Sequence, residues 1–181
     1  MVGHYRGKIF AWDVVNEAFD EIAARELRST IWRDQAGIGL AKNGSSHIER
    51  CFRWAHEADP RALLFYTDAE AEAVNPKSDA IYAMVRDFRR RGAPIDGVGL
   101  QMHIATCTPM FASISENIKR RSACRCTSRR WTPRCRSMRW ADIWSEIVAT
   151  CLAHPGCTAI QTRGATDKYS WNSRKTEGAA I

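Results

Sequence analysis

The sequence predicts an α/β domain built on a parallel sheet, and three observations support this prediction. Short apolar runs of the kind that form buried strands occur at residues 9–15, 63–66 and 97–103. Between them lie stretches with apolar residues three and four positions apart, as on one face of an amphipathic helix. The chain has 181 residues, which is enough for one domain with a core. Strand, helix and strand in repetition therefore indicate parallel βα units joined by right-handed crossovers.

The ends of the predicted helices carry recognisable signals. Pro76 is typical of a first helical turn, and Gly92 is typical of the residue just beyond a helix. Ser113 and Glu116 have the spacing of a capping box. On this basis we expect helices over residues 46–58, from Pro76 to just before Gly92, after Ser113 and around residues 143–152, followed by a last strand over residues 157–162.

This pattern alone leaves two architectures open, a doubly wound sheet and a piece of a (β/α)8 barrel. No GxGxxG motif follows a predicted strand, which weakens the dinucleotide-binding alternative. No run of about 18 apolar residues occurs, so we expect no membrane span and no membrane partner. Residues 1–6 lack the apolar stretch of a signal peptide, and the localisation stays unknown.

The net charge of +7 belongs to one segment of the chain. Nine basic residues and no acidic ones lie between Ile118 and Trp140, and the rest of the chain has 18 basic residues against 20 acidic ones. A nucleic-acid-binding segment over residues 119–139 is an alternative reading, since basic side chains and Trp131 could contact phosphates and a base. The segment carries no known nucleic-acid-binding signature, so we expect no nucleic-acid partner.

Three of the seven cysteines lie in the same basic segment, at positions 124, 126 and 135. Their spacing differs from that of a zinc knuckle and no histidine lies near, so we expect no metal site and no cofactor. Outside the segment, Cys151 and Cys157 flank a His-Pro-Gly turn and could pair, but the sequence does not decide this.

Polar side chains follow two of the predicted strands. Asn16 and Glu17 end the first, and Gln101 and His103 lie two apart at the end of the third. In a parallel α/β fold, active sites lie at the carboxyl ends of the strands, where a carboxylate can protonate a leaving group. The alternatives are that Glu17 starts the next helix and that the other pair is a set of hydrogen-bonded core groups.

Several segments, in this order, resemble glycoside hydrolase family 10, the endo-β-1,4-xylanases: WDVVNEAFDE, LRSTIWRD, AHEADPRALLFY, PIDGVGLQMHI and, near the end, GCTAIQTRGATDKYSW. The resemblance covers nearly the whole chain except residues 121–139. It implies a (β/α)8 TIM barrel and cleavage of the xylan backbone with retention. Such cleavage uses two carboxylates about 5–5.5 Å apart, one as acid/base and one as nucleophile.

The resemblance also implies roles for individual residues. Glu17 matches the acid/base glutamate, and Asn16 matches an asparagine that binds a sugar 2-hydroxyl. Gln101 and His103 match the strand that lines the cleft, and Trp171 matches an aromatic wall of the sugar subsites. Xylan or a xylo-oligosaccharide is the implied substrate, and no cofactor is implied. The oligomeric state stays open.

The nucleophile glutamate is not found in this sequence. The family carries it in a motif like ITEMD on the seventh strand, where this chain has the basic segment. Codons can be chosen that encode residues 121–138 as they stand and that, when the reading frame is shifted by two bases, encode VSLQVHITEMDAALPVD. We therefore interpret residues 121–139 as an aberrant, frameshifted segment that disrupts the seventh strand. Residues near Arg129 and Arg130 would then stand where the nucleophile belongs.

The chain is also short for a barrel of this type, which takes about 200 residues or more. We expect a single incomplete barrel domain over residues 1–181 that covers roughly the fourth to eighth βα units. The expected function is that of a retaining endo-1,4-β-xylanase, weak or inactive in this chain. The alternative is a catalytically dead fragment with residual carbohydrate binding.

Overall fold

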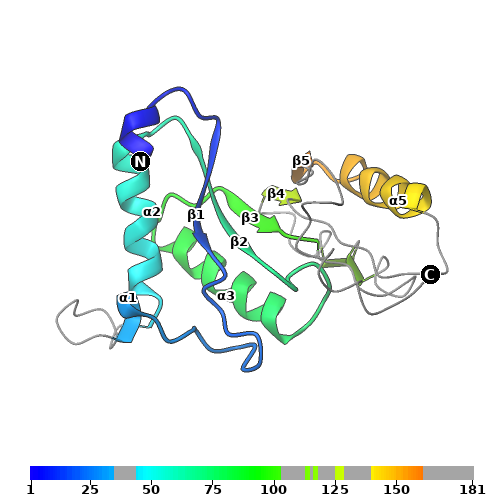
Figure 1. Cartoon of the computed structure of the whole chain (residues 1–181), viewed down its shortest axis with the longest axis horizontal. Helices are drawn as coiled ribbons and strands as arrows, with labels where there is room; N and C mark the ends of the chain where they lie inside the picture. The colour runs from blue at the N-terminus through cyan, green and yellow to red at the C-terminus, as the bar shows by residue number, and fades with distance from the viewer. Residues whose placement is uncertain (35–43, 103–112, 115, 118–124, 129–139, 161–181) are drawn as a thin grey trace, which may run out of the picture.

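A computed structural model describes residues 1–34, 44–102, 113–114, 116–117, 125–128 and 140–160. Its five strands form one sheet in sequence order (Figure 1). They are β1 (Ala11–Asn16), β2 (Leu63–Asp68), β3 (Gly97–Leu100), β4 (Arg125–Ser128) and β5 (Cys157–Ile160), and every neighbouring pair is parallel. The predicted α/β class with a parallel sheet is confirmed for the described residues.

Helices connect and cover the strands. The described helices are a 3-10 helix η1 (Val2–Tyr5), a short α1 (Ile31–Asp34), α2 (Ser46–Ala58), α3 (Pro76–Arg90) and α5 (Trp140–Leu152). Helix α2 packs against β1 and β2, whereas α5 lies at the opposite end of the sheet beside β5 (Figure 1). Each strand therefore reaches its parallel neighbour through a crossover, as the repeated pattern requires.

The core lies between the middle strands and the helices α2 and α3. Alternate residues of a strand face the same side, and Leu64 and Tyr66 of β2 share this side. They belong to one buried cluster with Val98 of β3, Phe52 of α2 and Val85 of α3. Burial of these apolar side chains stabilises the packing of α2 and α3 against the sheet.

Helix α3 begins as its sequence predicts. Pro76 is the first helical residue, and Asn75 and Ser78 form a reciprocal capping box in which each side chain accepts from the other's main-chain N–H, at 2.8 and 3.0 Å. Gly92, with φ 69°, follows the carboxyl end of the helix. The cap fixes the direction of the first turn, which carries Lys77 toward the strand ends.

Several strand boundaries differ from the prediction, among them the end of β2, which is Asp68 and not residue 66. β1 begins at Ala11 and not at residue 9: the register with β2 starts at Ala11 opposite Leu63, and the 75% exposed Phe10 joins it only through its carbonyl, which accepts from the N–H of Leu63. β3 ends at Leu100 and not at residue 103, because Met102 has φ 54°, which breaks the extended chain. Helix α2 has the predicted bounds.

The expectation that the seventh strand is disrupted is wrong for residues 125–128. β4 pairs with β3 from Arg125 opposite Gly97 to Ser128 opposite Leu100, and it pairs with β5 on its other edge. The hydrogen bonds of a parallel ladder come from the main chain, which every residue except proline supplies. A segment of unusual composition can therefore complete the sheet between two strands that offer free edges.

A disulfide joins Cys151, at the end of α5, to Cys157, at the start of β5. The sequence left this pairing open. The bond closes the turn between helix and strand, so it fixes where α5 leaves the sheet. Cys51, on α2, is a free and partly buried cysteine.

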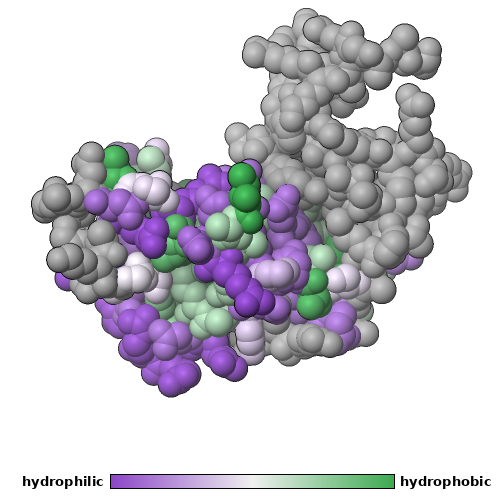
Figure 2. All heavy atoms as spheres, turned by 90° about the horizontal axis from the view of Figure 1, so that it is seen from below, coloured by the Kyte–Doolittle hydropathy of each residue, from purple (hydrophilic) through white to green (hydrophobic). Residues whose placement is uncertain are grey.

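Hydrophilic side chains surround smaller hydrophobic areas on the face seen from below in Figure 2. Across the described part of the chain, no helix has the length and apolar character needed to cross a membrane.

Candidate active site

The carboxyl ends of β1, β2 and β3 share an unusual backbone feature. Glu17, Glu70 and Met102 follow these three strands and all have positive φ angles, of 55°, 58° and 54°. Positive φ is uncommon for residues other than glycine, and such residues gather at functional sites. At Glu17 the conformation is supported by a hydrogen bond from its N–H to the carbonyl of Thr67 at 2.8 Å.

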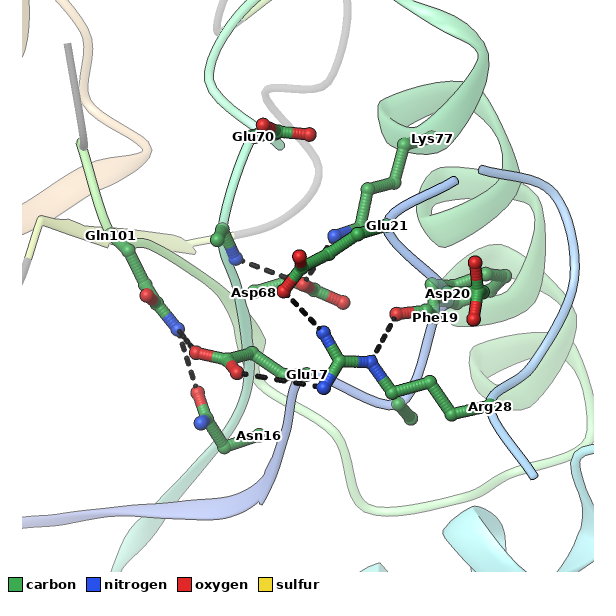
Figure 3. A network of polar contacts seen from close by, with 12 residues as sticks. Asn16, Glu17, Phe19, Asp20, Glu21, Arg28, Asp68, Glu70, Lys77 and Gln101 are labelled. Carbon is green, nitrogen blue, oxygen red and sulfur yellow. Dashed lines mark hydrogen bonds and ion pairs between the residues drawn. The ribbon is translucent and has the colours of Figure 1, made fainter. Parts of the chain in front are cut away.

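Three residues predicted from the sequence lie together at this edge of the sheet. The Nε2 group of Gln101 donates to Oδ1 of Asn16 at 2.9 Å and to Oε1 of Glu17 at 2.7 Å (Figure 3). Gln101 is 5% exposed, so its amide is held inside the fold. Strands β1 and β3 thus place an amide donor against a carboxylate, with β2 between them.

The second oxygen of Glu17 faces a cation. Nη1 of Arg28 lies 4.0 Å from Oε2 of Glu17, and Nη2 lies 2.6 Å from Oε1 of Glu21. The Nε of Arg28 also donates to the carbonyl of Phe19 at 3.0 Å. These contacts fix the guanidinium in the position drawn in Figure 3, where it bridges Glu17 and Glu21.

The pKa of Glu17 lies below its ordinary value of 4.5. The hydrogen bond from Gln101 is the largest cause, Arg28 and Lys77 add to it, and partial burial opposes it. The hydrogen bond with Asn16 also lowers this pKa. The group is therefore ionised at neutral pH, which suits a hydrogen-bond acceptor or a base. A general acid needs a raised pKa instead.

A second polar cluster at the end of β2 was not foreseen from the sequence. Asp68 is fully buried, and its Oδ1 lies 2.9 Å from Nζ of Lys77 and accepts from the N–H of Ala69 at 2.8 Å. The hydroxyl of Tyr66 donates to Oδ2 of Asp68. The available signal was a strand, LLFYTD, that ends in a carboxylate beside other polar strand ends.

The remaining predicted site residues cannot be placed. His103, Trp171 and the positions 129–130, where the nucleophile was expected, lie outside the described residues. Two of the three clustered cysteines, at positions 124 and 135, also lie outside them. Where side chains are described, no group of three or more His, Cys, Asp or Glu residues is arranged to hold a metal ion.

The comparison with protein families decides the lineage of the chain. The family described as glycosyl hydrolase family 10 matches residues 1–181. The chain belongs to this family. It is 36% identical to endo-1,4-beta-xylanase B from Thermotoga neapolitana over 94% of the chain and 50% of the relative, and 31% identical to endo-1,4-beta-xylanase 1 from Humicola insolens over 94% of the chain and 40% of the relative.

Solved structures of family 10 enzymes agree with the fold. Xylanase 10B from Thermotoga petrophila, in complex with xylobiose, superposes with a TM-score of 0.81 at 33% identity, over 98% of this chain and 54% of that chain. A family 10 protein from Paenibacillus barcinonensis superposes with a TM-score of 0.83 at 25% identity, over 98% of this chain and 57% of that chain. The predicted relation to a (β/α)8 barrel is thus confirmed, and the chain spans about half the length of the relatives it matches.

Proposed function

We propose that this chain functions in the hydrolysis of the xylan backbone as an endo-1,4-β-xylanase-type retaining glycoside hydrolase. Glu17 is the acid/base group in this proposal, Asn16 and Gln101 bind sugar hydroxyls, and His103 and Trp171 complete the sugar site. The substrate is xylan or a xylo-oligosaccharide. The chain corresponds to roughly the fourth to eighth βα units of the barrel.

The observation that carries the proposal is the shared hydrogen-bond donor of Gln101. It joins Glu17 and Asn16 at the edge of a parallel sheet, where barrel enzymes have their active sites. An amide and a carboxylate held this way present the acceptors and donors that a pyranose hydroxyl needs. Support for the substrate comes from the family and from two similar solved xylanases whose structures contain xylobiose.

The depressed pKa of Glu17 supports a low hydrolytic rate in this chain. In a retaining pair, the neighbouring nucleophile is a negative charge that raises the pKa of the acid/base group. The pKa of Glu17 is lowered, chiefly by the hydrogen bond from Gln101, which favours the ionised carboxylate over the protonated form that donates to a leaving group. Binding of sugar does not require that proton.

A reducing-sugar assay on xylan tests the hydrolytic part of the proposal. We expect release by this chain to be lower than release by a full-length family 10 xylanase by about three orders of magnitude or more, since residues of one catalytic unit fail together. Glu17→Gln should remove what activity remains. Release that equals the full-length enzyme would contradict the proposed defect, and release unaffected by Glu17→Gln would contradict the role of Glu17.

The second candidate is carbohydrate binding without hydrolysis. It is favoured by the same cluster, because the buried amide of Gln101 and the carboxylate of Glu17 are preorganised before any ligand arrives. Titration with xylobiose, followed by NMR shifts of the Gln101 side-chain amide, tests it. Cellobiose serves as the comparison sugar. Shifts with xylobiose and no sugar release would leave binding as the function of this chain.

A further inference from the structure

The peptide groups before and after Glu17 are each held by a group of β2. The N–H of Glu17 donates to the carbonyl of Thr67 at 2.8 Å, and the N–H of Ala18 donates to the phenol oxygen of Tyr66 at 3.0 Å. Glu17 has a φ of 55°, a conformation that is disfavoured for residues other than glycine. Such a conformation persists where contacts on both sides of the residue determine it.

The phenol of Tyr66 is itself oriented by a buried charge pair. Its hydroxyl donates to Asp68, whose other oxygen contacts the ammonium group of Lys77 at 2.9 Å. The Asp68 side chain is 0% exposed and the Lys77 side chain is 3% exposed. Burial and the Asp68 charge raise the pKa of Tyr66 well above its ordinary value, so the phenol keeps its proton. That proton points to Asp68, which leaves the phenol oxygen to accept from Ala18.

We propose that Tyr66, oriented by Asp68 and Lys77, is a positioning residue that holds the main chain at Glu17 and Ala18 and thereby directs the Glu17 carboxylate at Gln101. The importance of this positioning role for catalysis rests on the proposed function of Glu17. The positioning itself rests only on the contacts of Tyr66.

A packing role alone is the competing explanation, because the Tyr66 side chain is fully buried and its ring meets that of Phe19 edge to face, with centroids 6.3 Å apart. Tyr66→Phe separates the two roles. It keeps the ring and its contact with Phe19, and it removes the acceptor for Ala18 and the donor to Asp68. It does not alter Arg28 or Lys77, the two cations that lower the pKa of Glu17.

The test is a side-chain ¹³C NMR titration of Glu17 in the full chain, with the signal assigned by Glu17→Gln. We expect the pKa of Glu17 to rise by about half a unit or more in Tyr66→Phe, because the carboxylate is no longer held against Gln101. Tyr82→Phe on α3 is the matched control, since its ring keeps the cation–π contact with Arg86, and it should leave the Glu17 pKa unchanged. A folded Tyr66→Phe chain with an unchanged Glu17 pKa would overturn the proposal, whatever its melting temperature.

Amide hydrogen exchange in the unaltered chain provides a measurement that needs no variant. The Ala18 N–H should exchange at least about tenfold more slowly than an unprotected amide, because it is hydrogen-bonded to the phenol. Exchange at the unprotected rate would overturn the proposal even if Tyr66→Phe does not fold. A chain that shows the shifted Glu17 pKa in Tyr66→Phe but never cleaves xylan would refute the proposed hydrolysis and sustain the positioning role.

Discussion

Gln101 and Glu17 lie 84 positions apart in the chain and are joined by a hydrogen bond of 2.7 Å. The same nitrogen of Gln101 donates to Asn16 at 2.9 Å. One amide group therefore holds both Asn16, the last residue of β1, and Glu17, the residue after it. An amide NH2 carries two hydrogens and so can donate to both oxygens, and the reach of that side chain across β2 depends on the sheet order β1-β2-β3. The largest influence on the ionisation of Glu17 is therefore a residue that follows a different strand.

Replacement of Gln101 should raise the pKa of Glu17. Gln101→Leu removes the largest cause of the lowered pKa, while burial still opposes the smaller effects of Asn16, Arg28 and Lys77, so we expect a rise of about one unit. Gln101→Glu should raise the pKa further, because it removes the donor and adds a like charge. Side-chain ¹³C titration measures both. An equal Glu17 pKa in all three chains would show that the Gln101 contact does not control ionisation.

The depressed pKa of Glu17 also has a consequence for stability. A carboxyl group whose pKa is lower in the folded state than in the unfolded state stabilises the fold above the unfolded pKa. That contribution is lost as the pH falls through the folded pKa, which lies below 4.5 for Glu17. Urea unfolding of the unaltered chain and of Glu17→Gln at pH 7 and at pH 3 should therefore show a stability difference that shrinks at the lower pH. A difference that grows on acidification would contradict the sign.

The left-handed backbone conformation at Glu17 predicts that glycine at this position is more stable than alanine. Glu17→Gly and Glu17→Ala both remove the carboxylate, but only alanine keeps the steric conflict at φ 55°. We expect Glu17→Gly to exceed Glu17→Ala by about 1 kcal/mol in free energy of unfolding. Ala18→Gly, at a neighbouring residue without positive φ, should instead lower stability. A glycine variant no more stable than the alanine variant would show that position 17 is not strained.

Much of the fold follows from the sequence because local signals and periodicity agree. Helix α2 was predicted with its observed bounds, and the proline and glycine around α3 mark its ends correctly. The strand at residues 125–128 was not predicted, since its pairing depends on main-chain groups of β3 and β5 and not on its own side chains. Its position coincides with the apolar stretch of the shifted reading frame, and the frameshift itself stays a prediction.

The candidate site was only partly predictable. Asn16, Glu17 and Gln101 stood out because polar residues ended apolar strands. Arg28 and Lys77 gave no such signal, since each lies in a segment where a charged surface residue is the ordinary interpretation. Only the folded chain shows that the Lys77 side chain is buried against Asp68 and that Arg28 lies between two glutamates.

The Cys151–Cys157 disulfide should contribute measurably to stability. It closes a short loop between α5 and β5, and the chain-entropy model assigns such a loop about 2 kcal/mol. Reduction should therefore lower the melting temperature of the unaltered chain. The Cys151→Ser/Cys157→Ser variant should melt at that lower temperature with or without reductant. A reductant-insensitive melt of the unaltered chain would indicate that the two cysteines do not pair in solution.

The buried Lys77–Asp68 pair should show strong energetic coupling in a double-mutant cycle. Lys77→Met leaves the Asp68 charge without its partner in the interior, and Asp68→Asn does the same to Lys77. Breaking one partner of a buried pair costs about 3–5 kcal/mol, whereas replacing both removes the uncompensated charge. We therefore expect the double variant to be more stable than either single variant, as measured by urea unfolding.

The exposed pair of Arg91 and Asp87 on α3 is the comparison, and its coupling should stay below about 1 kcal/mol. If the losses of unfolding free energy in the two single variants add up to the loss in the double variant, the two charges do not stabilise each other. The Lys77–Asp68 pair would then not explain the orientation of the Tyr66 hydroxyl.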